Sequence, residues 1–199
     1  MIVSLTTYVL VVLLVFSVYF DLTQKRIPNF LTFPAILLGL IIFAVSGGWS
    51  GLLQGLSGFG VGIAVFFIPF ALGGMGAGDV KLMGAIGALK GLEFILYAAF
   101  FTALSGGVFA LAYLLFSGQL FSILKKVLLM AAVPFFKMLY IRFRNPYFSH
   151  LNVYYSAKLE SLQGQGKKRI NLPYGIAIAV GTILVLVIVN AEVHILPFL

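Results

Sequence analysis

Two aspartates stand out among the few charged residues of this chain. Asp21 and Asp79 are its only aspartates, and acidic residues number 5 in all. Each adjoins a long apolar segment, where an ionised carboxylate is costly and marks a functional site by default. Two carboxylates held close together share a proton, so one can accept a proton from water while the other donates to a carbonyl. The pair could therefore carry out general acid–base hydrolysis of a peptide.

Asp79 lies in the glycine-rich stretch GGMGAGDVKLMGAIGALKG, residues 73–91. Glycine permits backbone torsions closed to other residues and close approach of a second chain. We therefore predict an active-site loop that includes Gly76, Gly78 and Lys81, beside a pocket that water can enter. Two simpler interpretations stay open: Asp79 could cap the following helix, and Lys81 could anchor the chain at the membrane surface.

The composition indicates an integral membrane protein. Of the 199 residues, 62% are hydrophobic and 9% are charged, against roughly 25% charged in ordinary soluble domains. A bilayer core about 30 Å thick needs roughly 20 apolar residues per helix. We expect an all-α membrane protein of about six transmembrane helices, with the Gly-x-Gly-Asp loop opening the fourth. The apolar segments lie at 2–20, 30–46, 52–72, 80–89, 93–116 and 172–190.

The distribution of Lys and Arg predicts the orientation. With the N-terminus outside, every basic residue except Lys90 lies on the cytoplasmic side, as the positive-inside rule requires. Asp21 then ends the first helix and Asp79 opens the fourth, both at the cytoplasmic face. The uncharged GGWSG, residues 47–51, becomes an outer turn. The N-terminal apolar segment is expected to be a retained helix, because no basic region precedes it.

The stretch 117–171 is expected to be a basic cytoplasmic or interfacial insertion in a single membrane domain that spans 1–199. Its segment 120–144 is apolar but interrupted by lysines and a proline, as is typical of amphipathic helices that lie on the inner leaflet. A re-entrant segment is the alternative. The expected partner of this region is an anionic lipid headgroup.

Several kinds of site are excluded or disfavoured by composition. The chain has no cysteine, which excludes disulfides and cysteine-ligated metals. His150 and His194 are far apart in the sequence, so we expect no metal site and no cofactor. The net charge of +8 is better explained by membrane topology than by nucleic-acid binding, since no basic stripe on a folded polar module is present.

Three stretches resemble the type IV prepilin peptidase family of Gly-x-Gly-Asp membrane aspartyl proteases. They are DLTQKRIPNFLTF from Asp21, GMGAGDVKLMGAIGAL around Asp79, and LPYGIAIAVG from residue 172. The resemblance implies that Asp21 and Asp79 are the catalytic pair. It also implies removal of a short leader from prepilin or pseudopilin precursors at the cytoplasmic face of a prokaryotic inner membrane.

The resemblance favours a small single-domain member of the tight-adherence (Flp) pilus type. Larger members carry a cysteine-rich cytoplasmic domain and also N-methylate the new terminus, and this chain has no such cysteines. Two alternatives stay open: an archaeal preflagellin peptidase, and a non-enzymatic proton-coupled transporter, which also uses membrane carboxylates.

The helix dipole suggests how the pair divides its proton. Asp79 is expected at a helix N-terminus, which favours the ionised carboxylate, and Asp21 at a C-terminal end, which disfavours it. On this argument alone, Asp79 would be the base and Asp21 the acid.

Overall fold

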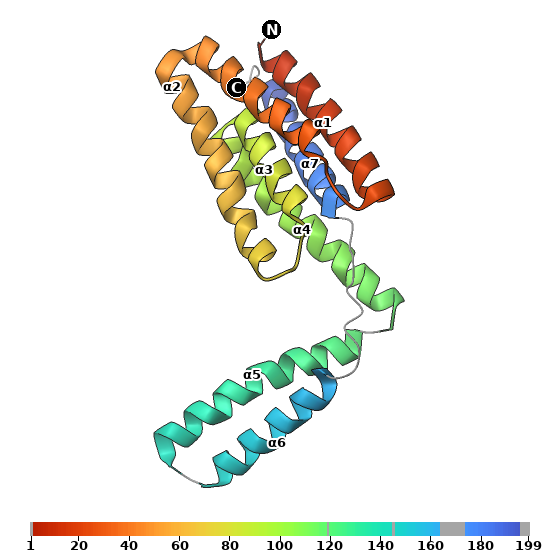
Figure 1. Cartoon of the computed structure of the whole chain (residues 1–199), viewed down its shortest axis with the longest axis vertical. Helices are drawn as coiled ribbons and strands as arrows, with labels where there is room; N and C mark the ends of the chain where they lie inside the picture. Colours follow the sequence, from red (N-terminus) through yellow and green to blue (C-terminus); the bar gives the residue numbers. More distant parts are fainter. Residues whose placement is uncertain (1, 119, 145, 164–173, 196–199) are drawn as a thin grey trace. The chain divides into compact units, whose positions relative to one another are not determined.

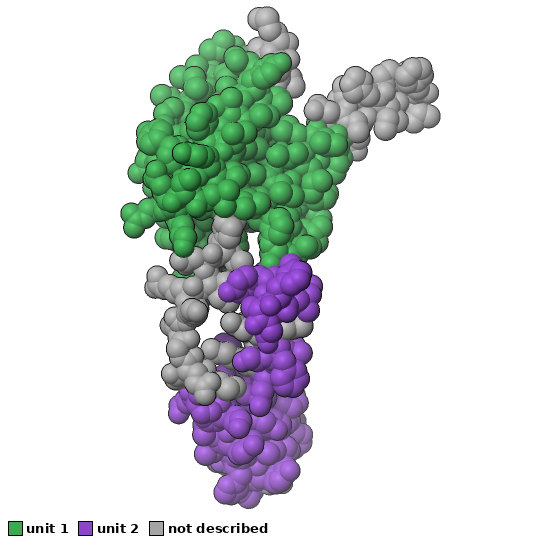
Figure 2. Space-filling model, turned by 90° about the vertical axis from the view of Figure 1, so that its right-hand side faces the viewer, with its two compact units in different colours: residues 1–109, 172–199 green, residues 110–171 purple. Residues whose placement is uncertain are grey.

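A computed structural model describes residues 2–118, 120–144, 146–163 and 174–195 (Figure 1). These residues form seven α-helices and no strand, which confirms the all-α fold expected from the sequence. The helices fall into two compact units, coloured separately in Figure 2: residues 1–109 with 172–199, and residues 110–171. The single membrane domain with an insertion at about 117–171 stays a prediction.

The first unit begins with α1 (Ile2–Gln24) and the long helix α2 (Asn29–Ala71). α2 has 43 residues but is broken at Gly48, whose φ of 57° and ψ of −138° are not helical. A positive φ is tolerated by glycine, which has no Cβ. The predicted outer turn at 47–51 is therefore a break within a helix, and it divides α2 into two arms that Figure 1 shows in different directions.

The short helix α3 (Ala77–Lys90) is buried against both arms of α2. Glycines make this approach possible. A Cβ built on Gly39, in the first arm, would meet the carbonyl oxygen of Ala88, and one on Gly58, in the second arm, would meet that of Gly87. Close backbone contact through small residues is how helices pack in lipid, as the sequence of this segment predicts.

α4 (Leu92–Phe116), up to residue 109, and α7 (Tyr174–Ile195) complete the first unit. Gly91, with a φ of 84°, turns the chain from α3 into α4. The hydroxyl of Ser105 on α4 donates to the carbonyl oxygen of Ala177 on α7 at 2.9 Å. The core joins apolar side chains of five helices, and its fully buried members include Leu10, Met83, Ile86, Ile95 and Ile178.

The second unit contains the end of α4, from residue 110, and two further helices, α5 (Leu120–Phe143) and α6 (Pro146–Gln163). The ring of Phe136 stacks on that of Tyr155, with centroids 5.1 Å apart and planes 4° apart. The largely polar residues 156–163 form the last turns of α6.

Three described helices, α1, α2 and α4, are long and apolar enough to cross a membrane. Each arm of α2 approaches the roughly 20 residues that one crossing needs. An all-α membrane protein is therefore confirmed, whereas six crossings stay a prediction.

Candidate active site

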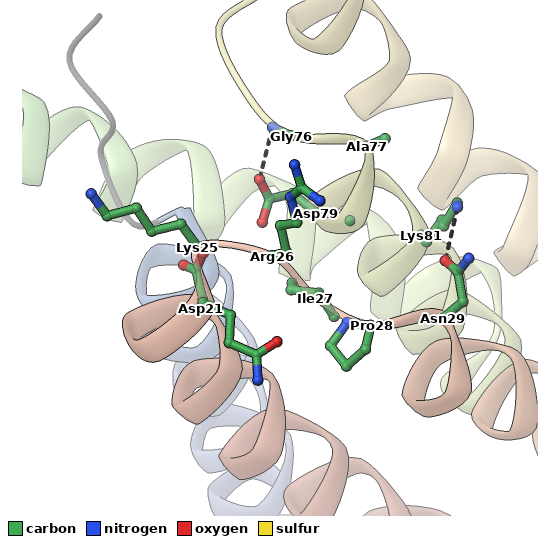
Figure 3. Close-up of a pocket in the computed structure, with 12 residues that line it drawn as sticks. Asp21, Lys25, Arg26, Ile27, Pro28, Asn29, Gly76, Ala77, Asp79 and Lys81 are labelled. Atoms are coloured by element: carbon green, nitrogen blue, oxygen red, sulfur yellow. Dashed lines mark hydrogen bonds between the residues drawn. The ribbon is translucent and has the colours of Figure 1, made fainter.

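Both aspartates line the same cavity, which has a volume of about 550 Å³. Figure 3 shows Asp21 on α1 and Asp79 on α3, with the connection from α1 to α2 between these helices. The residues that line the cavity come from the end of α1, this connection, the start of α2 and the start of α3: Asp21, Gln24, Lys25, Arg26, Ile27, Pro28, Asn29, Gly76, Ala77, Gly78, Asp79 and Lys81. Residues that are distant in the sequence thus form one site.

Asp21 lies in the last turn of α1 and is held by the first turn of α7. The backbone N–H of Gly175 donates to Asp21 Oδ2 at 2.8 Å. The first N–H groups of a helix have no partner within it and favour a negative charge. The start of α7 therefore offsets the unfavourable position of a carboxylate at the C-terminal end of α1.

Asp79 is held in a similar way by the start of its own helix. It occupies the third position of α3, and its Oδ2 accepts the backbone N–H of Gly76 at 3.0 Å. The expected helix-capping contact is therefore present, although Gly76 and not Asp79 is the N-cap residue. The side chain of Asp79 is 7% exposed, which is more buried than a helix cap requires.

Burial changes the protonation expected for Asp79, which lies outside the three helices long enough to cross a membrane. Burial, with a smaller contribution from the negative charge of Asp21, raises the pKa of Asp79 to about 6 against the opposing hydrogen bond from Gly76. The helix dipole alone predicts an ionised Asp79, but desolvation of the carboxyl acts in the opposite direction and is larger.

Lys81 joins the start of α3 to the start of α2. Its Nζ donates to Asn29 Oδ1 at 2.9 Å and lies 5.7 Å from the ring centroid of Phe33. Gly78 packs against the connection at Ile27, where an added Cβ would lie 3.0 Å from the Ile27 Cβ. These two contacts hold the connection that follows Asp21 against the helix that carries Asp79.

The Gly-x-Gly-Asp stretch differs from the predicted loop. Gly76 precedes α3, but residues 77–79 already form its first turn. Among the glycines of 73–78, Gly73 has a positive φ, of 75°, whereas Gly76 is extended. Gly76, Gly78 and Lys81 line the cavity, while their place in an active site stays a prediction.

Sequence reasoning did not assign Gly175 and Asn29 to the site. Both lie in stretches that carry the family resemblance, LPYGIAIAVG and DLTQKRIPNFLTF. Their roles depend on contacts with Asp21 and Lys81, which are 154 and 52 residues away in the sequence. In the described residues no three His, Asp or Glu side chains gather as a metal would require.

The family model for the type IV leader peptidase family matches residues 8–111, more than half of the chain, and includes both aspartates. The chain belongs to this family. It is 30% identical to the prepilin leader peptidase/N-methyltransferase of Neisseria gonorrhoeae, over 60% of this chain and 44% of that protein. It is 31% identical to the protein of that name from Bacillus subtilis (strain 168), over 53% and 42%.

The chain thus spans less than half the length of these curated relatives. No solved structure matches it.

Proposed function

We propose that this protein is a membrane aspartyl endopeptidase that removes the leader from prepilin or pseudopilin precursors. The observation that carries the proposal is that Asp21 and Asp79 line one cavity, each with a carboxylate oxygen bound by a backbone N–H near a helix start. Membership of the type IV leader peptidase family supports it. The names of the relatives support prepilins as the substrate class.

The reaction needs one proton on the pair. The ionised carboxylate accepts a proton from water, and the water oxygen bonds to the peptide carbonyl carbon. The protonated carboxyl donates its proton to the carbonyl oxygen. When the tetrahedral intermediate collapses, the C–N bond breaks, the amine leaves with a proton, and the pair returns to its singly protonated state.

Asp79 is the better candidate for the acid. It is 7% exposed, and burial raises its pKa to about 6, so it holds a proton more readily than an ordinary aspartate. Asp21 is partly buried, which disfavours its charge, but it is more exposed than Asp79 and its Oδ2 accepts the backbone N–H of Gly175, which favours the ionised form. We therefore assign the base to Asp21, the reverse of the assignment that the helix dipole suggests. Because the pair titrates as a unit, this describes its dominant microstate.

The proposed location is the cytoplasmic face of a prokaryotic inner membrane. Lys25, Arg26 and Lys81 surround the cavity, and such a cluster favours the cytoplasmic side. The cysteine-free chain makes this testable with single cysteines. A cysteine at Gln24 should react with a membrane-impermeant thiol reagent from the cytoplasmic side, and one at Trp49, beside the break in α2, from the outside. The opposite pattern would refute the location.

The activity is tested with the purified full chain in nanodiscs and a panel of prepilin, pseudopilin and preflagellin precursors. Mass spectrometry of the products should show a new N-terminus. Asp21→Asn and Asp79→Asn should each reduce cleavage by about 10²–10⁴-fold, whereas Glu93→Gln, at an exposed position, should cleave normally. Unimpaired cleavage by either aspartate variant would refute the mechanism. Aspartate-dependent proton uptake into liposomes, without cleavage, would support the transporter instead.

A further inference from the structure

A lysine is half-buried at the end of α3 that lies away from the active-site cavity. Lys90 is the last residue of α3, and its Nζ donates to Thr7 Oγ1 on α1 at 2.6 Å. The same Nζ lies 5.9 Å from the ring centroid of Phe94 on α4. Burial lowers the pKa of Lys90, because a charged lysine loses hydration free energy here that a solvated lysine keeps.

The Lys90–Thr7 contact and the aspartate pair lie at opposite ends of the same two helices. Thr7 contacts Lys90 near the start of α1, and Asp21 shares the cavity with Asp79 near its end, so α1 and α3 are antiparallel. At 1.5 Å per residue, Thr7 and Asp21 are about 21 Å apart along α1, and Asp79 and Lys90 about 17 Å apart along α3.

Apolar side chains of both helices fill the core between these two ends. Leu10 and Leu14 of α1 are buried in the same cluster as Met83 and Ile86 of α3. Apolar burial is not directional and permits small shifts along a helix axis. A hydrogen bond from a charged donor is directional and stronger than a neutral one, so it fixes the relative position of the two helices.

α3 is the better fixed member of this pair. Gly39, Gly58 and Gly62 of α2 bring the backbones of α2 and α3 into direct contact, and an added Cβ at Gly62 would lie 2.5 Å from the Met83 carbonyl oxygen. α1 has a polar contact near each of its ends, Thr7 with Lys90 and Asp21 with Gly175.

We propose that Lys90 is a positioning residue, which sets the axial register of α1 against α3 through Thr7 and so the alignment of Asp21 with Asp79. The proposal rests on the proposed peptidase function. A displacement of about 1 Å at a catalytic group can reduce a rate by about 10²-fold, so a distant contact that controls register affects the reaction.

Kinetics of the full chain test the proposal. Lys90→Met should lower kcat by about tenfold or more, with KM changed much less, because the cavity that binds substrate keeps its lining. Lys90→Arg keeps a charged donor and should restore most of kcat. Glu93→Gln, one turn away on the exposed surface, is the matched control. If Lys90 only stabilises the fold, Lys90→Met will lower the melting temperature while kcat of the folded enzyme stays unchanged, and the proposal fails.

A double-mutant cycle tests whether Lys90 acts through Thr7. Thr7→Val should lower kcat in the wild-type background and have little further effect in Lys90→Met, since both changes remove the same interaction. Additive effects on kcat would overturn this part of the proposal.

A second readout does not depend on activity. Cysteines at two exposed residues that line the cavity, Gln24 on α1 and Ala77 on α3, can be joined by a short bifunctional thiol reagent in the otherwise cysteine-free chain. Lys90→Met should change the crosslinking rate, and Lys90→Arg should restore it. An unchanged rate overturns the proposal. If the wild-type chain cleaves no precursor but Lys90→Met alters crosslinking, the proposed function fails while the register role stands.

Discussion

The backbone N–H of Gly175 donates to Asp21 Oδ2 at 2.8 Å, across 154 residues of sequence. A Cβ added at Gly175 would lie 2.7 Å from the same oxygen and 3.1 Å from the carboxyl carbon. Glycine is thus required here because the carboxylate of Asp21 occupies the space that a side chain would fill. The first turn of α7 is in direct contact with one member of the proposed catalytic pair.

Gly175→Ala should therefore displace Asp21 and lower kcat by about tenfold to a hundredfold, while most of the protein still folds. Gly107→Ala on α4 is the matched control, because a Cβ there meets nothing within 4 Å. Cleavage kinetics and a thermal melt of both variants check this. Normal kinetics in Gly175→Ala would show that the precise placement of Asp21 is unimportant.

Asp79→Asn should abolish cleavage and yet raise thermal stability at neutral pH. The folded-state pKa of about 6 lies above the ordinary aspartate pKa of 3.8. The stability that this difference contributes is full below pH 3.8 and is lost as pH rises through 6. An uncharged side chain at position 79 does not lose this stability. The difference in thermal stability between Asp79→Asn and wild type should therefore grow from pH 3.8 to about pH 6 and then level off. A variant that is less stable at every pH would indicate that Asp79 is chiefly a helix cap.

The pH dependence of kcat/KM should have an alkaline limb near the pKa of about 6 for Asp79. Above that pH the pair loses its shared proton and no acid remains for the carbonyl oxygen, so kcat/KM should fall about tenfold per pH unit. Initial rates at low substrate concentration measure this profile, with Glu93→Gln expected to match wild type. A rate that continues to rise to about pH 8 would mean that the reactive form carries no proton on the pair.

The sequence predicted the elements of the fold because lipid imposes a strong and local constraint on them. The predicted segments at 2–20, 80–89 and 93–116 correspond to α1, α3 and α4 within a few residues. Both aspartates were found because carboxylates are rare next to apolar segments.

Contacts between residues that are distant in the sequence could not be predicted from local sequence patterns. The bond from Gly175 to Asp21 and the pair of Lys81 with Asn29 depend on how α7 and the α1–α2 connection pack. No local pattern specifies that packing. The proposed protonation of Asp79 differs from the one that the helix dipole suggests for the same reason: position in a helix can be read from sequence, but burial against other helices cannot.

Gly58→Ala should destabilise the first unit severely. A Cβ at Gly58 would meet the backbone of Gly87 and lie 2.7 Å from the carbonyl carbon of Gly91. Since backbone atoms cannot move aside as flexible side chains do, α2 and α3 would have to separate, at a cost of about 1–3 kcal/mol or more. Gly60→Ala, two residues along the same helix with open space at its Cβ, should melt like wild type. Thermal melts in detergent compare the two, and equal melting temperatures would refute the close α2–α3 contact.

The second unit should bind anionic lipid. Exposed basic residues, including Lys125, Lys137 and Arg142, lie on α5 together with exposed apolar side chains such as Met138, which is 69% exposed. Each Lys or Arg near an anionic surface contributes about 1 kcal/mol, and salt weakens the attraction. We expect an environment-sensitive dye at Met138→Cys to shift to the blue in nanodiscs with anionic lipid, less so in zwitterionic lipid or high salt. Replacing Lys125 and Lys137 by Glu should remove the shift, while the same dye at Trp49→Cys should not respond to lipid charge. Equal emission at 138 in both lipids would contradict the proposed headgroup partner.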